Sequence, residues 1–106
     1  MEEKNIDEKY KEQVEKEKLN NGLDIPEADF SFFITSLGLQ ASIALGNIPN
    51  PLTNRIEENI KQARLLIDTL AILKEKTKGN LSKDEETLLD NLLYELRMQY
   101  INKTKV

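Results

Sequence analysis

The sequence predicts an all-α protein, and three observations carry that prediction. Of its 106 residues only four are glycine and three are proline, while 39% are hydrophobic and 32% charged, which is typical of helical domains. Apolar side chains in the second half recur three and four residues apart, which is the helical repeat. No stretch alternates apolar and polar residues as a strand does. We expect an N-terminal helix plus an antiparallel helical hairpin, a three-helix bundle-like unit that oligomerises.

Residues 1–24 precede the predicted helical domain, which spans residues 25–103. The first nineteen residues contain seven acidic and five basic side chains. Ile6, Tyr10 and Val14 recur every fourth residue, but this stripe is one residue wide and offers little apolar area to a core. We therefore expect a charged flexible tail or a frayed helix.

The first helix of the domain is expected at about residues 27–45. No charged residue occurs from Phe30 to Asn54, so most of this helix is apolar or small and polar. Pro26 suits a first helical turn, and Gly46 suits the left-handed residue that follows a helix. Two prolines shortly afterwards exclude helix from the connection.

A second helix is expected at about residues 55–78. Asn54 can cap its start, with Glu57 three residues later as in a capping box. Its apolar residues step by four and three, the spacing that suits a near-parallel or antiparallel partner helix. That stripe consists of Ile56, Ile60, Ala63, Ile67 and Leu70.

A short turn joins the second helix to a third, expected at about residues 83–101. Gly79 and Asn80 form the turn, and Ser82 with Glu85 makes the best capping box in the chain. The third helix carries a leucine face. Because the connection is so short, the second and third helices must run antiparallel.

Apolar residues lie on more than one face of these helices. On a wheel of about 100° per residue, one face of the first helix carries Phe30, Phe33, Ile34, Leu37, Ala41, Ala44 and Leu45. A second set points away from the predicted stripes and stays uncovered in a single chain. Such a patch is rarely tolerated on a monomer, and a symmetric dimer is the commonest remedy. We expect the oligomer interface at Phe32, Leu39, Ile43, Leu65 and Ile72.

Small side chains share a third side of the first helix: Ser31, Thr35, Gly38 and Ser42. Two interpretations stay open. Another helix backbone crosses closely at this side, or the side packs in the ordinary way against the helix at 55–78.

One carboxylate is expected to have a structural partner. Asp68 lies beside the apolar stripe of the second helix, four residues after Arg64. It can pair with Arg64 within the helix or with Arg97 across the hairpin. A structural ion pair between Asp68 and Arg97 is the interpretation carried forward.

The residue types argue against several function classes. Without histidine or cysteine the chain has no catalytic imidazole, thiol nucleophile or Cys/His zinc site. A net charge of −4 disfavours nucleic-acid binding, because phosphate backbones attract basic proteins. We expect no enzymatic activity, no catalytic residue, no metal, no cofactor and no small-molecule substrate. No apolar signal segment is recognisable near the N-terminus, which favours a cytoplasmic location.

A series of landmarks runs in order through residues 29–101. Its most specific part is Glu75 to Ser82, followed by Glu85 and Glu86. The other landmarks are Phe33, Ser36, Leu37, Gln40, Ala41, Leu45, Gly46, Pro49, Pro51, Ala63, Ile67, Asp68, Leu70, Leu89, Leu96, Arg97 and Tyr100. This series resembles a small bacterial family, the domain of unknown function 1844. The resemblance implies a small cytosolic helical protein with no assigned activity.

Two functions are consistent with these features. The first is a homo-oligomeric protein–protein interaction or scaffold module, in which the chain binds itself and can also bind another protein. The alternative is a membrane-associated accessory factor that docks a membrane protein through its uncharged helix at 30–46. A membrane span is disfavoured there, because serine, threonine and glutamine interrupt the apolar run.

Overall fold

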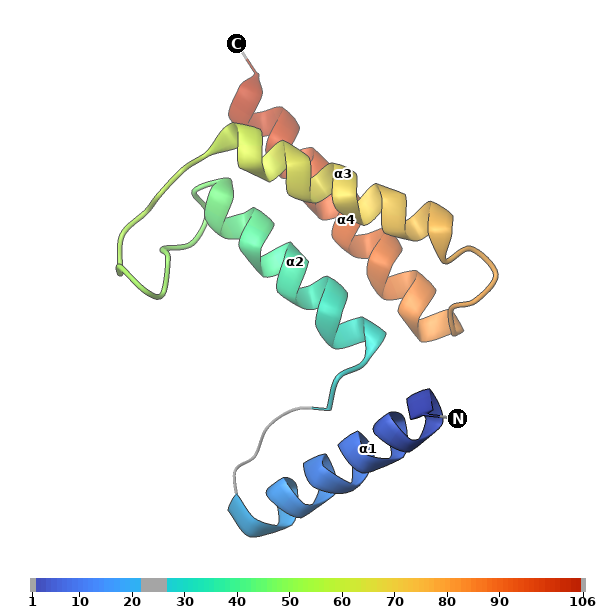
Figure 1. Ribbon diagram of the computed structural model, residues 1–106. Helices are drawn as coiled ribbons and strands as arrows, with labels where there is room; N and C mark the ends of the chain where they lie inside the picture. The colour runs from blue at the N-terminus through green and yellow to red at the C-terminus, as the bar shows by residue number, and fades with distance from the viewer. Residues whose placement is uncertain (1, 22–26, 106) are drawn as a thin grey trace.

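The chain is helical wherever it forms regular structure. The computed structural model describes residues 2–21 and 27–105. It contains α1 (Glu2–Asn21), α2 (Phe30–Ala44), α3 (Ile60–Lys76) and α4 (Lys83–Thr104) (Figure 1). Within these ranges there is no strand, and one isolated bridge joins Asn50 and Arg55. The prediction of an all-α protein is confirmed.

Helix α1 makes no contact with α2, α3 or α4 within the part of the chain that the structure describes (Figure 1). Of the narrow apolar stripe, Ile6 and Tyr10 are exposed and Val14 is partly buried. An ion pair joins Lys18 to Glu27, and this hydrogen bond raises the pKa of the Lys18 ammonium. The segment expected as a tail or frayed helix is thus helical to Asn21, and residues 22–24 lie outside the described ranges.

Helix α2 starts at Phe30 rather than near residue 27. Asp29 caps it, because its side chain accepts a hydrogen bond from the Phe32 backbone N–H at 2.7 Å. Pro26, expected in the first turn, lies outside the described residues. At the other end Gly46 has a φ of +79°, the left-handed conformation that commonly follows a helix.

Helix α3 begins later than the sequence predicted. Its cap is Asn59, whose side chain accepts a hydrogen bond from the Gln62 backbone N–H at 3.1 Å. Asn54 instead lies in a turn with a φ of +60°, whereas a capping residue is normally extended. The expected helix at 55–78 is therefore corrected to Ile60–Lys76.

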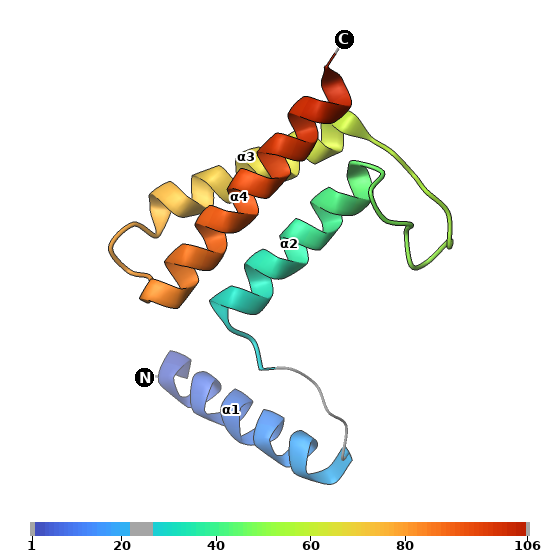
Figure 2. The same cartoon turned by 180° about the vertical axis from the view of Figure 1, so that it is seen from behind.

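Hydrogen bonds in the connection explain the later start. The Glu57 carboxylate accepts from the Asn50 side-chain amide at 3.0 Å and from the Thr53 hydroxyl at 2.9 Å, so it does not serve a helix cap. The Asn59 backbone N–H donates to the Ala44 carbonyl at 2.7 Å, which fixes the start of α3 against the end of α2. The connection between these helices projects as a loop (Figures 1 and 2).

A tight turn joins α3 to α4. Gly79 has a φ of +84° in this turn. Ser82 and Glu85 form a full capping box: the Glu85 N–H donates to the Ser82 hydroxyl at 3.2 Å, and the Ser82 N–H donates to the Glu85 carboxylate at 2.8 Å. Helix α4 then continues to Thr104, beyond the expected end at residue 101.

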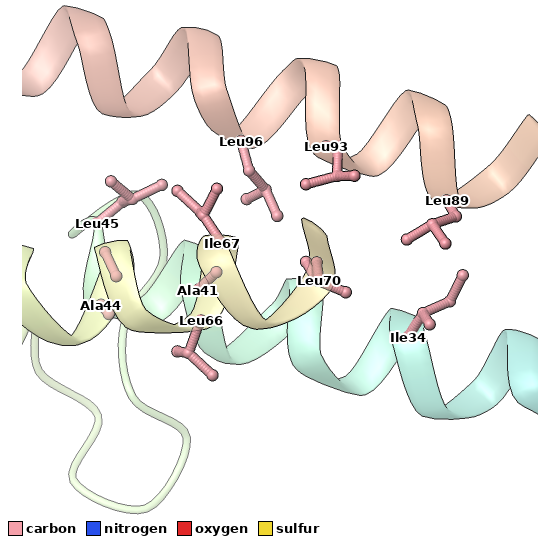
Figure 3. Packing of buried hydrophobic residues seen from close by; sticks show 11 residues of the cluster. Ile34, Ala41, Ala44, Leu45, Leu66, Ile67, Leu70, Leu89, Leu93 and Leu96 are labelled. Carbon is pink, nitrogen blue, oxygen red and sulfur yellow. The ribbon is translucent and has the colours of Figure 1, made fainter. Parts of the chain in front are cut away.

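One apolar core lies among α2, α3 and α4. Its buried members are Ile34, Ala41, Ala44, Leu45, Ala63, Leu66, Ile67, Leu70, Leu89, Leu93 and Leu96. The three α4 leucines point toward α2 and α3 (Figure 3). Two expected core residues are excluded: Phe33 is 48% exposed at the edge of its helix face, and Ile56 is exposed because it lies in the connection before α3.

Candidate functional site

The residues expected at an oligomer interface lie at the surface of the single chain. Phe32, Leu39, Leu65 and Ile72 are each more than half exposed, and Ile43 is partly buried. Three of the five are on α2 and two on α3. These side chains therefore contribute little to the chain's own core and present apolar area to solvent.

Leu39 and Ile43 come together at a hollow of about 600 Å³, which we call the α2 hollow. Ala44 also lines it from α2, while Glu57 and Glu58 line it from the segment before α3. The other three expected interface residues are not among those that line it. The α2 hollow is thus a concave feature whose exposed surface is mostly apolar, although six of its eleven lining residues are polar or charged, and it includes two of the five expected interface residues.

Sequence reasoning missed the most exposed large apolar residue of the described chain. Leu52 is 92% exposed and lines the same hollow, next to Pro51. It lies in a turn, where no helical or strand repeat can reveal which way a side chain points. The sequence does hold one signal: a single leucine lies between a proline and an asparagine, residue types that form turns. From the sequence alone, this segment is predicted only as a connection between helices.

The side of α2 with small residues meets α4 at Gly38. Gly38 is buried, and a Cβ built on it would lie 2.9 Å from the Leu92 Cδ2 atom. Ser31 and Ser42 are partly buried, whereas Thr35 is exposed. At Gly38 the neighbour is therefore α4, and the choice between the two interpretations for the rest of this side stays open. Gly38 allows Leu92 to approach the α2 backbone closely.

The expected ion pair between Asp68 and Arg97 is not present in the described residues. Arg64 is the partner instead, with its Nε atom 3.8 Å from Asp68 Oδ2, because the two lie one turn apart on α3. Asp68 and Arg97 do line one cavity of about 230 Å³, together with Tyr100. Since the Arg64–Asp68 pair is well exposed, it adds little stability.

The turn between α3 and α4 has a structural role for Gly79, Asn80 and Ser82, which shape the backbone or cap α4. The Asn80 N–H donates to the Thr77 carbonyl at 2.8 Å, which closes the turn. Apart from Gly79 and its two chain neighbours, no described residue has an atom within 4 Å of a Cβ built on Gly79, so only its φ favours glycine. Next to this turn an ion pair between Lys74 Nζ and Asp90 Oδ1, at 2.8 Å, links α3 to α4.

The described residues form neither a metal-binding cluster nor a membrane-spanning helix. Across residues 2–21 and 27–105, no group of three or more acidic side chains is placed to hold a metal ion. The absence of a metal and of a cofactor stays a prediction from the sequence. None of the four helices in these ranges combines the length and the apolar content needed to cross a bilayer.

Comparison with known proteins identifies the family. The family model described as "Domain of unknown function (DUF1844)" matches residues 27–102, which covers α2, α3 and most of α4. No curated protein and no solved structure matches the chain. The landmarks through residues 29–101 had predicted the same family. The chain belongs to the DUF1844 family.

Proposed function

We propose that this protein is a homo-oligomeric interaction or scaffold module of the cytoplasm, without enzymatic activity. One observation carries the proposal: four of the five apolar residues that the sequence sets apart from the core are more than half exposed on the single chain, and one of these borders a hollow together with the partly buried fifth. Exposed apolar side chains gathered around a concave surface are typical of protein interaction sites. The lack of histidine and cysteine supports a role without chemistry.

The energetics favour an interface larger than the five expected residues. Full burial of one large apolar side chain is worth about 1.5–3 kcal/mol, so a half-exposed one gains about 1 kcal/mol on binding. A symmetric dimer buries these five residues from both chains, which supplies about 10 kcal/mol. A micromolar dissociation constant requires about 8 kcal/mol beyond the entropic cost of association. Neighbouring residues must therefore contribute.

Charge introduced at the α2 hollow tests the proposal. In a variant with Leu39→Glu and Ile43→Glu, two carboxylates would have to be desolvated in the interface, which is costly. We expect this variant to dissociate to a helical monomer of lower stability. The matched control is Ile6→Glu with Tyr10→Glu, which places the same charges on exposed apolar residues of α1.

Sedimentation velocity and far-UV circular dichroism provide the readout. The control should keep the assembly of the wild-type protein, while the α2 variant should lose it and retain its helical signal. If both variants assemble like the wild type, the outer face of α2 is not the interface. If both dissociate equally, nonspecific charge repulsion is the cause, and the proposal loses its support.

A further inference from the structure

The turn at residues 50–55 is held in one shape by its own hydrogen bonds. Its backbone closes through the Asn50 N–H, which donates to the Arg55 carbonyl at 2.9 Å. The Asn50 side-chain oxygen accepts from the Leu52 N–H at 2.9 Å, and the Glu57 carboxylate binds the side chains of Asn50 and Thr53. A turn fixed in this way loses little conformational entropy on binding, so it is pre-organised for docking.

At this turn Leu52 is almost wholly in water, at 92% exposure. The residue lines the α2 hollow and yet remains exposed, so it does not fill the hollow of its own chain. A protruding apolar side chain and an apolar hollow therefore lie on the same face of the molecule. Such a face is self-complementary, which is the condition for an interface with two-fold symmetry.

Charged residues of both signs accompany the turn and the hollow. Arg55 ends the turn, is exposed without lining the hollow, and makes no ion pair within the described residues. Glu57 and Glu58 line the hollow. Glu58 has one long contact to Lys103, 3.6 Å between Oε2 and Nζ, which leaves carboxylate oxygens for a second cation. Arginine pairs with carboxylates in a bidentate, directional way.

We propose that Leu52 of each chain inserts into the α2 hollow of a second copy, between Leu39 and Ile43, in a reciprocal two-fold dimer. Arg55 then lies near the Glu57 and Glu58 carboxylates of the other copy. The inference rests on the proposed function and specifies which surface performs it. It also supplies the apolar contact that the five expected interface residues lack.

Cross-linking tests the contact directly, because the chain has no cysteine of its own. Single variants Leu52→Cys and Ile43→Cys are purified, mixed in equal amounts and oxidised. A disulfide between different chains needs the two substituted positions within bonding distance. We expect covalent dimers in this mixture, and few in a control mixture of Leu52→Cys with Tyr94→Cys, since Tyr94 is exposed on α4.

The affinity of the dimer provides an independent measurement. Leu52→Ser should raise the dissociation constant roughly a hundredfold to ten-thousandfold, because both copies of the reciprocal dimer lose the burial of a leucine. The matched control is Ile56→Ser, an exposed apolar residue near the turn that does not line the hollow. Sedimentation equilibrium of both variants gives the comparison, and the control should bind like the wild type.

The outcomes separate this inference from the proposed function. A wild-type dimer that is unaffected by Leu52→Ser, or that shows no preferred cross-link, overturns the inference and leaves self-association through another surface. Equal weakening by Leu52→Ser and Ile56→Ser also overturns it. A wild-type chain that is monomeric throughout overturns both, and binding of Leu52 by a different protein would then be the remaining reading.

Discussion

Alanine in place of Gly46 should destabilise the protein more than alanine in place of Gly79, although their φ angles are +79° and +84°. Placing a side chain in the left-handed region destabilises the folded state by about 1–2 kcal/mol. Alanine also lowers the conformational entropy of the unfolded chain, which offsets about 0.4–1 kcal/mol of that loss. Around Gly79 the space is open, so we expect a net loss of about 1 kcal/mol.

Gly46 has a neighbour that Gly79 lacks. A Cβ at Gly46 would lie 3.0 Å from the Glu58 Oε2 atom and 3.4 Å from the Glu58 Cβ. The carboxylate can swing aside at the expense of its exposed contact with Lys103, worth up to about 1 kcal/mol. The Glu58 Cβ moves only with the backbone ahead of α3. We therefore expect Gly46→Ala to cost about 2–3 kcal/mol in all.

Urea unfolding followed by circular dichroism, at one fixed protein concentration, measures both variants. The double variant Gly46→Ala with Glu58→Ala completes a mutant cycle, and it should recover the part of the excess that comes from the Glu58 carboxylate, whereas the contact with the Cβ at position 58 remains. Equal losses at the two glycines, with no coupling to Glu58, would refute the steric argument. A stable Gly79→Ala variant would refute the left-handed turn.

Three further predictions follow from the packing. Deleting residues 1–24 should change the melting temperature by less than about 8 °C, because α1 makes no contact with the other helices in the described chain; a larger drop would show that it docks. Leu70→Ala should cost about 2–5 kcal/mol, because Leu70 is fully buried, and calorimetry would contradict this with a loss below 1 kcal/mol. Ser82→Ala should cost about 1 kcal/mol through loss of the capping box, whereas Asn80→Ala should cost less in the same melts.

The start of α4 could be predicted from residues that are close together in the sequence. The Ser82–Glu85 capping box needs only residues that are neighbours in sequence, so its pattern sets the start of α4 at Lys83. The leucines of α4 repeat with a helical period, and Leu89, Leu93 and Leu96 are buried as a consequence. Elements whose signals are local or strictly periodic can be read without coordinates.

The start of α3 was not predictable in the same way. Asn54 and Asn59 are both of a residue type that can cap a helix, and they are followed three positions later by Glu57 and Gln62. The choice between them depends on a contact with a distant residue, the hydrogen bond from the Asn59 N–H to the Ala44 carbonyl. The position of Leu52 depends on the same folded connection. For that reason the α2 hollow became visible only in the structure.

Sedimentation equilibrium of the wild-type protein, over dilutions through the micromolar range, tests self-association most directly. The account predicts a species of twice the 12.2 kDa chain mass that dissociates on dilution. A constant mass of 12.2 kDa at every concentration would contradict it. In that case the apolar residues around the α2 hollow would not bring two copies together.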